Sequence, residues 1–504
     1  MLFTRIIDTS QAVGATRSRK AKIESLRELL GNLDPGDVGT VVSWLSGELP
    51  QGRIGIGWKT LSGIDVAPTD EGALTITDVD SALAAIASTS GSGSTARRRE
   101  LLSDLFGSAT RSEREFLIRL MTGELRQGAL EGVMTDAIAK AAGLPLDPVR
   151  RAFMLSGRLA ATATAALTGG EDALEAFGLE IGRPIRPMLA SPAESLLSAW
   201  TELTGDVSVE YKLDGARIQV HRDGDEVHIY TRTLREITDG VPELVDLVRS
   251  LPCTSVVLDG ETLALTDSGR PRPFQETMSR FGAQSTHELL LRPYFFDCIH
   301  LDGEDLLDQP LTKRLDALEL VAPEHRIPAL LRPDADAAAG HFDAAMDAGH
   351  EGVMVKALSS VYAAGRRGRT WQKVKPEHTL DLIVLGAEWG YGRRTGWLSN
   401  LHLGARNPDG GEPIMVGKTF KGLTDQLLQW QTEEFPLHER ARDEHTVYLE
   451  PDLVVEIELD GVQVSTRYPG GVALRFARVL RYRPDKTHAE ADTIDAVRAL
   501  LQAG

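Results

Sequence analysis

Apolar residues recur at helical spacing through the first third of the chain. Residues 23–30 carry isoleucine and leucines three and four positions apart, and Gly31 follows as a stop signal. Residues 112–142 repeat this pattern. Between the two stretches, a Ser/Gly-rich run at residues 88–95 predicts a flexible connection between two helical lobes. The pattern therefore predicts an all-α domain over residues 1–185.

The pattern changes after Pro184, Pro187 and Pro192, which mark a boundary. Short strand-like runs predominate from there, with helical stretches at residues 311–320 and 341–348. This mixture predicts an α+β domain over residues 186–375. Its strand-like runs are residues 207–210, 216–222, 226–231, 255–261, 294–301 and 353–356.

The last segment, residues 376–504, alternates strand-like runs with short Gly/Asp turns. Five strands in a segment of this length fit a small Greek-key β-barrel. The chain is thus predicted to be multi-domain, with an all-α, an α+β and a β-barrel domain in that order. The five runs of the last segment are residues 382–388, 397–404, 413–418, 453–459 and 474–481.

Length and composition agree with a globular, multi-domain protein. A chain of 504 residues is too long for one hydrophobic core, and 42% apolar with 25% charged residues is ordinary for a folded protein. No run of 18 or more apolar residues is present, so we expect a soluble cytoplasmic protein with no membrane partner. Cys253 and Cys298 have no metal-ligand spacing and fit a reducing compartment.

The net charge of −18 argues against a nucleic-acid partner at first sight, because phosphate binding favours basic proteins. The charge is unevenly distributed: the three predicted domains carry −3, −9 and −6. Basic clusters interrupt the acidic background. The net charge therefore does not exclude a polyanionic partner. The clusters are residues 17–22, 97–99, 366–369 and 475–486.

The most informative stretch lies between two of the strand-like runs. Residues 210–217 read Glu-Tyr-Lys-Leu-Asp-Gly-Ala-Arg, which places Lys212 near a tight Asp-Gly turn. A lysine amine attacks phosphorus only when it is deprotonated, and its ordinary pKa is about 10.4. Burial, nearby cations or a metal would have to lower that pKa. Arginine could not replace the lysine, because a guanidinium stays protonated. Taken alone, the octet fits an ordinary charged hairpin equally well.

Six further motifs follow in order along the chain. They are Thr231-Arg232-Thr233, Asp259-Gly260-Glu261, Tyr294-Phe295-Phe296-Asp297, Glu351-Gly352-Val353-Met354-Val355-Lys356, Trp371-Gln372-Lys373-Val374-Lys375 and the stretch at residues 475–486. With the octet, this series resembles the covalent nucleotidyltransferases, which include DNA ligases, RNA ligases and mRNA capping enzymes. With its helical N-terminal domain, the chain resembles an ATP-dependent DNA ligase of the archaeal and eukaryotic replicative type.

The resemblance implies a fold and a reaction. Residues 1–185 would be a DNA-binding domain, residues 186–375 the adenylation domain and residues 376–504 an OB-fold. Residues 123–129 also resemble a signature in the DNA-binding domain of the larger ligases. Lys212 would attack ATP, expel pyrophosphate and keep AMP as a phosphoramidate. The AMP would pass to a DNA 5′-phosphate, and a 3′-hydroxyl would then seal the nick and release AMP.

The resemblance also implies a role for each motif residue, with ATP and Mg²⁺ as cofactors. Carboxylates suit Mg²⁺, which prefers hard oxygen ligands, and an aromatic face suits a purine ring. Arg366 and Arg369 compete with Arg367 for one position. By position, Glu210 and Phe296 would hold adenine; Arg217 and Arg232 would lie near the ribose and phosphates; Glu261 and Glu351 would hold the metal, Glu261 alternatively the ribose; and Lys356, Arg367, Lys373 and Lys375 would surround the triphosphate.

Lys486, with Arg481 and Arg483, would act from the OB-fold, which must swing over the triphosphate for AMP uptake and away for sealing. The hinge would lie at residues 375–381. Two positions depart from the usual family pattern: Gln372 replaces an apolar residue, and Pro484 fills a variable position.

Alternative functions remain at this point. An RNA ligase or a GTP-dependent capping enzyme shares the first motif, although capping enzymes lack a large helical N-terminal domain. An NAD-dependent DNA ligase would need a four-cysteine zinc module. A non-catalytic DNA-end scaffold is a further alternative, but it would have no need of the intact lysine and carboxylate set. For the DNA ligase we expect a monomer acting on nicked duplex DNA in repair, replication or recombination.

Overall fold

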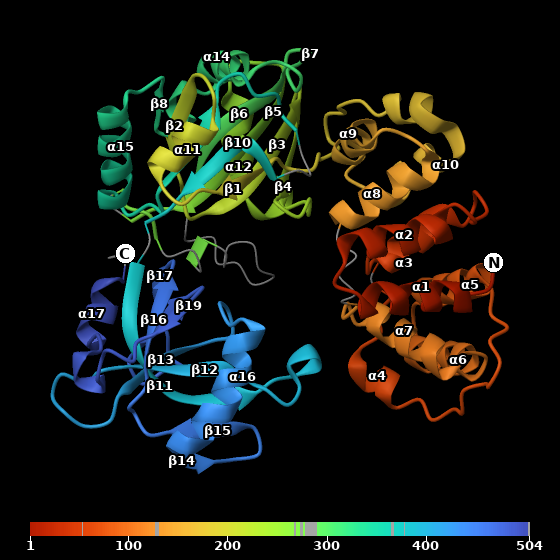
Figure 1. Cartoon of the computed structure of the whole chain (residues 1–504). Helices are drawn as coiled ribbons and strands as arrows, with labels where there is room; N and C mark the ends of the chain where they lie inside the picture. Colours follow the sequence, from red (N-terminus) through yellow and green to blue (C-terminus); the bar gives the residue numbers. More distant parts are fainter. Residues whose placement is uncertain are drawn as a thin grey trace.

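The computed structural model describes residues 1–52, 54–125, 131–266, 269–272, 276–277, 290–363, 367–376 and 378–501. These residues form a helical domain, a central domain of two sheets and a C-terminal sheet domain, so the predicted multi-domain fold is confirmed. The central domain lies above the C-terminal domain in Figure 1, and the helical domain stands to their right. None of the described helices is long and apolar enough to cross a membrane.

The helical domain forms one core rather than two lobes. Residues from Phe3 to Leu174 belong to a single buried cluster, in which Phe3 contacts Trp44 and Phe116 edge to face. The prediction that residues 88–95 separate two helical lobes is wrong, because α5 and α6, which lie on either side of this segment, contribute to the same core. The helices are α1 (Thr4–Ala15), α2 (Arg19–Leu30), α3 (Val38–Leu45), α4 (Trp58–Ser62), α5 (Ile76–Ser88), α6 (Ser94–Gly107), α7 (Arg111–Met121), α8 (Glu131–Ala142), α9 (Leu146–Ser156) and α10 (Leu159–Glu175).

Side-chain caps explain where several of these helices begin. The Thr75 and Thr110 hydroxyls each accept a hydrogen bond from the backbone N–H three residues on. The carboxylate of that residue, Asp78 or Glu113, accepts in turn from the threonine N–H, which completes a capping box at α5 and α7. The signature at residues 123–129 follows α7, and its last four residues lie outside the described part of the chain.

The central domain contains two five-stranded sheets, ordered β1-β10-β9-β2-β8 and β4-β3-β5-β6-β7. The predicted strand runs fall on β2 to β6 and β9, whereas β1, β7, β8 and β10 were not among the predicted runs. The same domain contains the helices α11 (Leu196–Glu202), α12 (Pro242–Ser250), α14 (Leu311–Val321) and α15 (Ala335–Asp347). The strands are β1 (Leu189–Pro192), β2 (Val207–Tyr211), β3 (Ala216–Asp223), β4 (Glu226–Thr231), β5 (Ser255–Ala264), β6 (Leu291–Leu301), β7 (Glu304–Asp305), β8 (Ala329–Leu331), β9 (Val353–Ala357) and β10 (Arg367–Val374).

The C-terminal domain is built around β11 (His378–Trp389), a long strand that pairs with β12, β15 and β16. The sequence predicted five strands, but the described residues contain β11 to β19. The predicted run at residues 474–481 divides into β18 and β19, because Phe476 adopts a positive φ of 55° between them. The other elements are β12 (Leu398–Ala405), β13 (Ile414–Thr419), α16 (Asp425–Glu434), β14 (Glu439–Arg442), β15 (Thr446–Leu449), β16 (Val454–Leu459), β17 (Gly461–Val464), β18 (Val472–Arg475), β19 (Arg478–Tyr482) and α17 (Ile494–Ala499).

The helical and central domains share an apolar contact. Met154 and Leu155 of α9 belong to the same buried cluster as Ile185, Met188 and Leu213. Outside this cluster, two parallel hydrogen bonds join Arg151 to Asp308. Because α9 helps to complete a core of the central domain, the helical domain cannot be removed without exposing apolar surface.

The segment between these domains is held by a buried polar network on β3. The Gly182 N–H donates to Nδ1 of His221 at 3.1 Å, and the Ile185 N–H donates to Oε1 of Gln219 at 2.8 Å. Gln219 Nε2 donates back to the Ile185 carbonyl at 3.2 Å. His221 Nε2 lies 2.9 Å from Gln219 Oε1, so the neutral ring must carry its proton on Nε2.

This network predicts an acid-sensitive interdomain connection. Burial lowers the pKa of His221 to about 3, and the neighbouring imidazoles of His228 and His300 add to the effect. A depressed histidine pKa stabilises the fold above the ordinary value of about 6.5, and this contribution is lost as the pH falls toward 3. We therefore expect the melting temperature to fall between pH 7.5 and 5.5, by the equivalent of about 1 kcal/mol from this residue.

The measurement is thermal unfolding of wild type and His221→Gln at the two pH values. His221→Gln starts lower at pH 7.5 but should fall less on acidification, whereas the exposed His488→Gln should behave as wild type. An equal fall in His221→Gln and wild type would show that His221 is not the group responsible.

Candidate active site

A pocket of about 820 Å³ opens between the two sheets of the central domain, and the C-terminal domain contributes Arg475 and Phe476 to its wall. Most of the residues predicted for the site lie together in this wall. They are Glu210, Lys212, Arg217, Arg232, Glu261, Phe296, Glu351, Lys356 and Lys373. Lys375 lies beside the pocket and reaches Glu351, whereas the side chain of Arg367 lies outside the described part of the structure.

Backbone pairing places Lys212 beside Glu351. The Lys212 N–H donates to the Gly352 carbonyl at 2.8 Å, and the Glu351 N–H donates to the Lys212 carbonyl at 3.0 Å. Gly352 has a φ of 131°, and a Cβ there would lie 2.2 Å from the Val374 carbonyl oxygen. A Cβ on Gly215 would lie 2.4 Å from the Thr262 carbonyl oxygen. Both motif glycines are therefore required by close backbone approach.

Glu351 is surrounded by cations. Its carboxylate accepts a hydrogen bond from Lys212 Nζ and lies 3.2 Å from Lys375 Nζ and 3.5 Å from Arg475 Nη2. Burial alone would raise the pKa of Glu351, but the ammonium groups of Lys212 and Lys375 outweigh it and hold the pKa at about 2. Glu351 is therefore ionised at neutral pH, and any metal that it binds must displace one of these cations.

Glu261 is the second predicted metal ligand and has a different environment. Its carboxylate forms no hydrogen bond or ion pair with another described residue, and it faces the pocket. Desolvation raises the pKa of Glu261 to about 8, although the charges of Arg217 and Lys212 act in the opposite direction. A carboxylate that is costly to ionise gains most from a bound cation. The donor set therefore fits Mg²⁺, which commonly binds through one or two carboxylates and substrate phosphates.

Glu261 and Glu351 are only two carboxylates, so phosphate oxygens would have to supply further ligands. In the described ranges, no group of three or more His, Cys, Asp or Glu side chains is arranged to hold a metal ion.

Lys356 lies in the wall of the pocket beside two other predicted site residues. Its ammonium forms a fully buried ion pair with Glu210, and it lies 4.4 Å from the Phe296 ring centroid and 4.2 Å from that of Trp371. The resemblance assigned Lys356 to the triphosphate, but Glu210 and Phe296 to adenine. Lys356 thus contacts both residues that are predicted to hold adenine, and its role at the triphosphate stays a prediction.

Arg217 is also committed to protein contacts. Its guanidinium donates two hydrogen bonds to Asp259 and a third to the Met188 carbonyl, and it lies 5.3 Å from the Phe296 ring. Arg232, in contrast, is an exposed side chain on the pocket wall. Of these two arginines, Arg217 is the one that protein contacts hold in place before a ligand binds.

The remaining cations gather at the mouth of the pocket. Lys373 lies near Lys375 and Lys212, and burial together with these charges lowers the pKa of Lys373. Arg475 donates to Asp214 at 2.9 Å across the domain boundary, and Lys375 donates to Asp460 at 2.9 Å in the same region. Arg475 belongs to the last motif of the sequence. No role was predicted for it, because spacing does not show which end of the motif faces the pocket.

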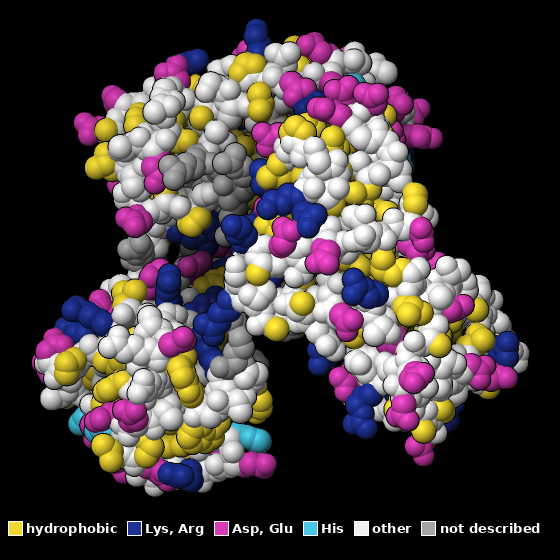
Figure 2. All heavy atoms as spheres, turned by 45° about the vertical axis from the view of Figure 1, so that its right-hand side comes forward, with side chains coloured by type: hydrophobic (Ala, Val, Ile, Leu, Met, Phe, Trp, Pro, Cys, Tyr) yellow, Lys and Arg dark blue, Asp and Glu magenta, His cyan; other side chains and the backbone are white. Residues whose placement is uncertain are grey.

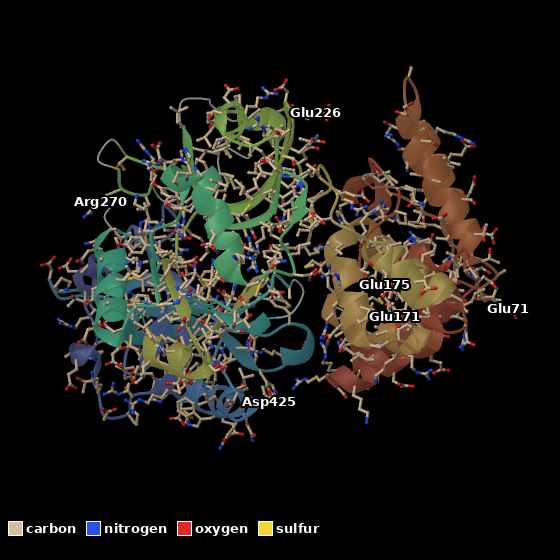
Figure 3. All side chains as sticks on the ribbon, turned by 90° about the horizontal axis from the view of Figure 1, so that it is seen from above. Glu71, Glu171, Glu175, Glu226, Arg270 and Asp425 are labelled. Carbon is tan, nitrogen blue, oxygen red and sulfur yellow. The ribbon has the colours of Figure 1, made fainter. Side chains whose placement is uncertain are left out.

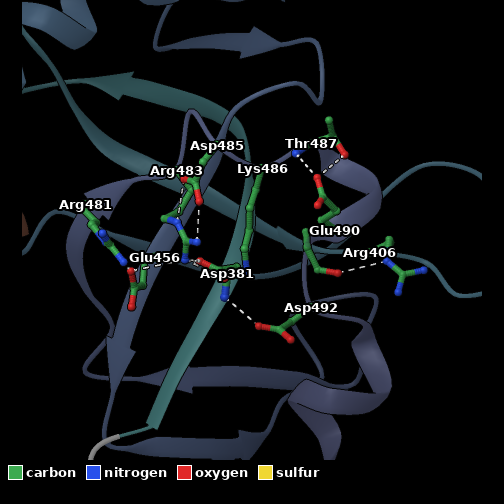
Figure 4. Close-up of polar contacts among 11 residues, drawn as sticks. Asp381, Arg406, Glu456, Arg481, Arg483, Asp485, Lys486, Thr487, Glu490 and Asp492 are labelled. Atoms are coloured by element: carbon green, nitrogen blue, oxygen red, sulfur yellow. Dashed lines mark hydrogen bonds and ion pairs between the residues drawn. The ribbon is translucent and has the colours of Figure 1, made fainter.

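The other cations of that motif lie elsewhere. Figure 4 shows Lys486 and Arg483 on Asp381, and Arg481 on Glu456, within the C-terminal domain. In this domain arrangement Arg475 reaches the pocket and Lys486 does not.

Sequence comparisons identify relatives along the whole chain. Residues 64–139, 187–375 and 394–486 match the families described as DNA ligase N terminus, ATP dependent DNA ligase domain and ATP dependent DNA ligase C terminal region. A "Probable DNA ligase" of Rhodococcus jostii is 77% identical over 501 residues, covering 99% of this chain and 100% of the relative. The Mycobacterium marinum protein of that name is 52% identical over 513 residues, covering 99% and 100%.

Structural comparison extends the fold to a distant protein. The solved structure titled "Pmar-Lig_PreS3" matches with a TM-score of 0.62 at 18% identity, covering 95% of this chain and 99% of that chain. This likeness concerns the fold alone.

The contacts of Lys356 with Glu210 and Phe296 lead to a binding prediction. Lys356→Met leaves the buried Glu210 carboxylate without its cation and should weaken adenosine binding at least tenfold, because an uncompensated buried charge costs several kcal/mol. Adenosine carries no phosphate, so Lys373→Met should bind it nearly as wild type. The measurement is titration calorimetry with adenosine. Unchanged adenosine affinity in Lys356→Met would favour the triphosphate assignment of Lys356.

Proposed function

The chain belongs to the ATP-dependent DNA ligase family, and on this premise we propose that Lys212 is the residue that carries AMP during nick sealing. The contact between Lys212 and Glu351 at the floor of a cation-lined pocket is the observation that carries this proposal. The RNA-ligase and capping-enzyme alternatives are set aside, because the family matches and the full-length relatives are DNA ligases.

In the first step Lys212 must leave Glu351, lose a proton and attack the α-phosphorus of ATP. A P–N bond forms, the bond from the α-phosphorus to the bridging oxygen breaks, and pyrophosphate leaves with the electron pair. Lys373, Lys375 and Arg475 lie on the mouth side of Lys212, where negative charge on the leaving group would develop. Fixed cations at that position stabilise the transition state without reorganisation.

Mg²⁺ is the metal that we propose for this site, with Glu351 and Glu261 as the protein residues that would hold it. When bound, Mg²⁺ supplies charge neutralisation to the phosphate oxygens. The chain's own contribution is to keep Glu351 ionised through its cationic neighbours and to present the desolvated Glu261 carboxylate to the pocket.

In the second step an oxygen of a DNA 5′-phosphate attacks the lysyl-linked AMP, so a P–O bond replaces the P–N bond and Lys212 is restored. In the third step the 3′-hydroxyl of the nick attacks the adenylated phosphate, a phosphodiester forms and AMP leaves. Both steps need the DNA ends at the pocket mouth, which the C-terminal domain partly covers through Arg475 and Phe476.

The surface charge supports a duplex partner. Figure 2 shows Lys and Arg side chains gathered around the hollow between the domains, and Asp and Glu gathered on the upper outer surface. Figure 3 places Glu71 at the edge of the helical domain that lies away from the central domain, and Glu171 and Glu175 elsewhere on the same domain. Basic residues in a concave region favour DNA phosphates there, and outward carboxylates disfavour DNA elsewhere. We further propose a cytoplasmic monomer that associates with the nucleoid and serves repair, replication or recombination.

The first test is covalent AMP transfer. Incubation with Mg²⁺ and ATP should add one adenylate to the wild-type protein, as read by intact mass, and GTP or NAD should add little. Lys212→Ala should gain nothing, because Lys375, which also contacts Glu351, is held by Asp460 of the C-terminal domain at 2.9 Å. Lys313→Ala, on the outer face of α14, is the matched control and should label normally. Labelling of Lys212→Ala would assign the nucleophile elsewhere.

The second test separates AMP uptake from sealing. Arg475→Ala should slow self-adenylation at least tenfold, because it removes a cation from the phosphate end, yet leave sealing of a pre-adenylated nick near the wild-type rate. The sequence-based interpretation predicts the same profile for Lys486→Ala. If Lys486→Ala shows it too, the C-terminal domain must move further than the present arrangement. Equal loss in both assays for both variants would mean that the motif only stabilises this domain.

A further inference from the structure

A closed ring of hydrogen bonds lies beneath the pocket and joins four segments of the chain. The Met188 N–H donates to the Tyr362 hydroxyl oxygen at 3.1 Å, and the Tyr362 O–H donates to Asp259 Oδ2 at 2.6 Å. Asp259 accepts from Arg217 Nη2 at 2.6 Å and Nε at 3.0 Å. Arg217 Nη1 then donates to the Met188 carbonyl at 2.7 Å, which closes the ring.

The members of the ring differ in what they can reach. Asp259 and Tyr362 are buried, at 0% and 1% exposure, and neither lies in the pocket wall. Arg217 and Met188 do line the pocket. Burial and the adjacent Asp259 charge raise the pKa of Tyr362 well above its ordinary range, so the phenol keeps the proton that it donates. Tyr362 can thus influence the pocket only through other residues.

The ring restricts the Arg217 guanidinium. Three of its five N–H groups are used by Asp259 and Met188, and one N–H on each of Nη1 and Nη2 remains. The two bonds to Asp259 fix the guanidinium plane, since a bidentate pair has a defined geometry. Asp259 is itself oriented by the Tyr362 hydroxyl. The direction of the two remaining N–H groups therefore depends on a hydroxyl that does not reach the pocket.

We propose that Tyr362 is a positioning residue for AMP transfer, which acts through Asp259 to hold Arg217 in its nucleotide-binding orientation. The proposal rests on the function given above and adds to it a residue that no motif of the sequence contains. The ring also holds both backbone groups of Met188, the residue directly before β1, whose Leu189, Ala190 and Pro192 line the pocket. The Arg217 bond to the Met188 carbonyl thus ties this edge of the pocket to the same guanidinium.

The competing explanation is that Tyr362 only packs the core. Its ring stands edge-on to Trp371 at 6.1 Å and lies beneath Arg314 at 5.9 Å. Tyr362→Phe keeps these ring contacts and removes only the hydroxyl, so it separates the two explanations. A matched control is Tyr230→Phe. The Tyr230 hydroxyl donates to the Gly182 carbonyl in the segment between the helical and central domains, but it has no bond to Asp259 or Arg217.

The experiment measures KM for ATP and kcat of self-adenylation, together with melting temperature, in the full-length protein. Tyr362→Phe should raise KM about tenfold, as expected when one hydrogen bond to a charged group is lost, and change kcat less than about twofold. Tyr230→Phe should lower the melting temperature to a similar extent and leave KM unchanged. A melting-temperature loss in Tyr362→Phe without a change in KM would overturn the proposal.

A double-mutant comparison tests the route of the effect. In an Arg217→Met background, Tyr362→Phe should cause no further rise in KM, because its target is already absent. A full additional rise would show that Tyr362 acts independently of Arg217 and would overturn the proposal. Failure of the proposed function is distinguishable, since wild-type protein would then take up no AMP, whereas failure of this inference leaves wild-type adenylation intact.

Discussion

The carboxylate of Glu351 is the electrostatic centre on which the catalytic arrangement depends. Lys212 from the motif turn, Lys375 from the end of the central domain and Arg475 from the C-terminal domain converge on this one group. Without Glu351, three cations would face one another with no carboxylate between them, and each would raise the electrostatic energy of the others. One side chain therefore holds the proposed nucleophile, contacts a second lysine and forms an ion pair with the C-terminal domain.

The same centre explains how an acidic protein can act on polyanions. The net charge of −18 is a property of the whole sequence, whereas a nucleotide or a DNA end responds to the local field at the site. At the pocket, the cationic side chains outnumber the carboxylates that face them. Part of the basic character counted in the sequence serves structure instead: Arg98 and Arg99 donate to backbone carbonyls between helices, and Arg19 pairs with Asp136.

The ordered motifs predicted most of the residues that line the pocket, because the motif residues lie in strands or in the turns beside them. Lys212 and Glu351 follow this rule, since two backbone hydrogen bonds couple their segments. The sequence could not show pairings between distant segments. The Lys356–Glu210 ion pair depends on the pairing of β9 with β2, and the Tyr362–Asp259 bond joins residues 103 positions apart; neither has a local signal. The fold follows the same logic: the class was predictable from periodicity, but the single helical core and the break between β18 and β19 depend on tertiary packing and on the positive φ of Phe476.

The two domain boundaries differ in physical character, and this difference suits the reaction. The helical domain is joined to the central domain through a shared apolar cluster that contains Met154 and Leu155. Among the hydrophobic clusters of the described residues, none combines the C-terminal domain with the central one; Arg475–Asp214 and Lys375–Asp460 join them instead. Apolar burial is lost in full on separation, whereas partly exposed ion pairs exchange for water at a smaller net cost. The C-terminal domain can therefore leave the pocket and return within one catalytic cycle, while the helical domain stays attached to the domain that carries the AMP.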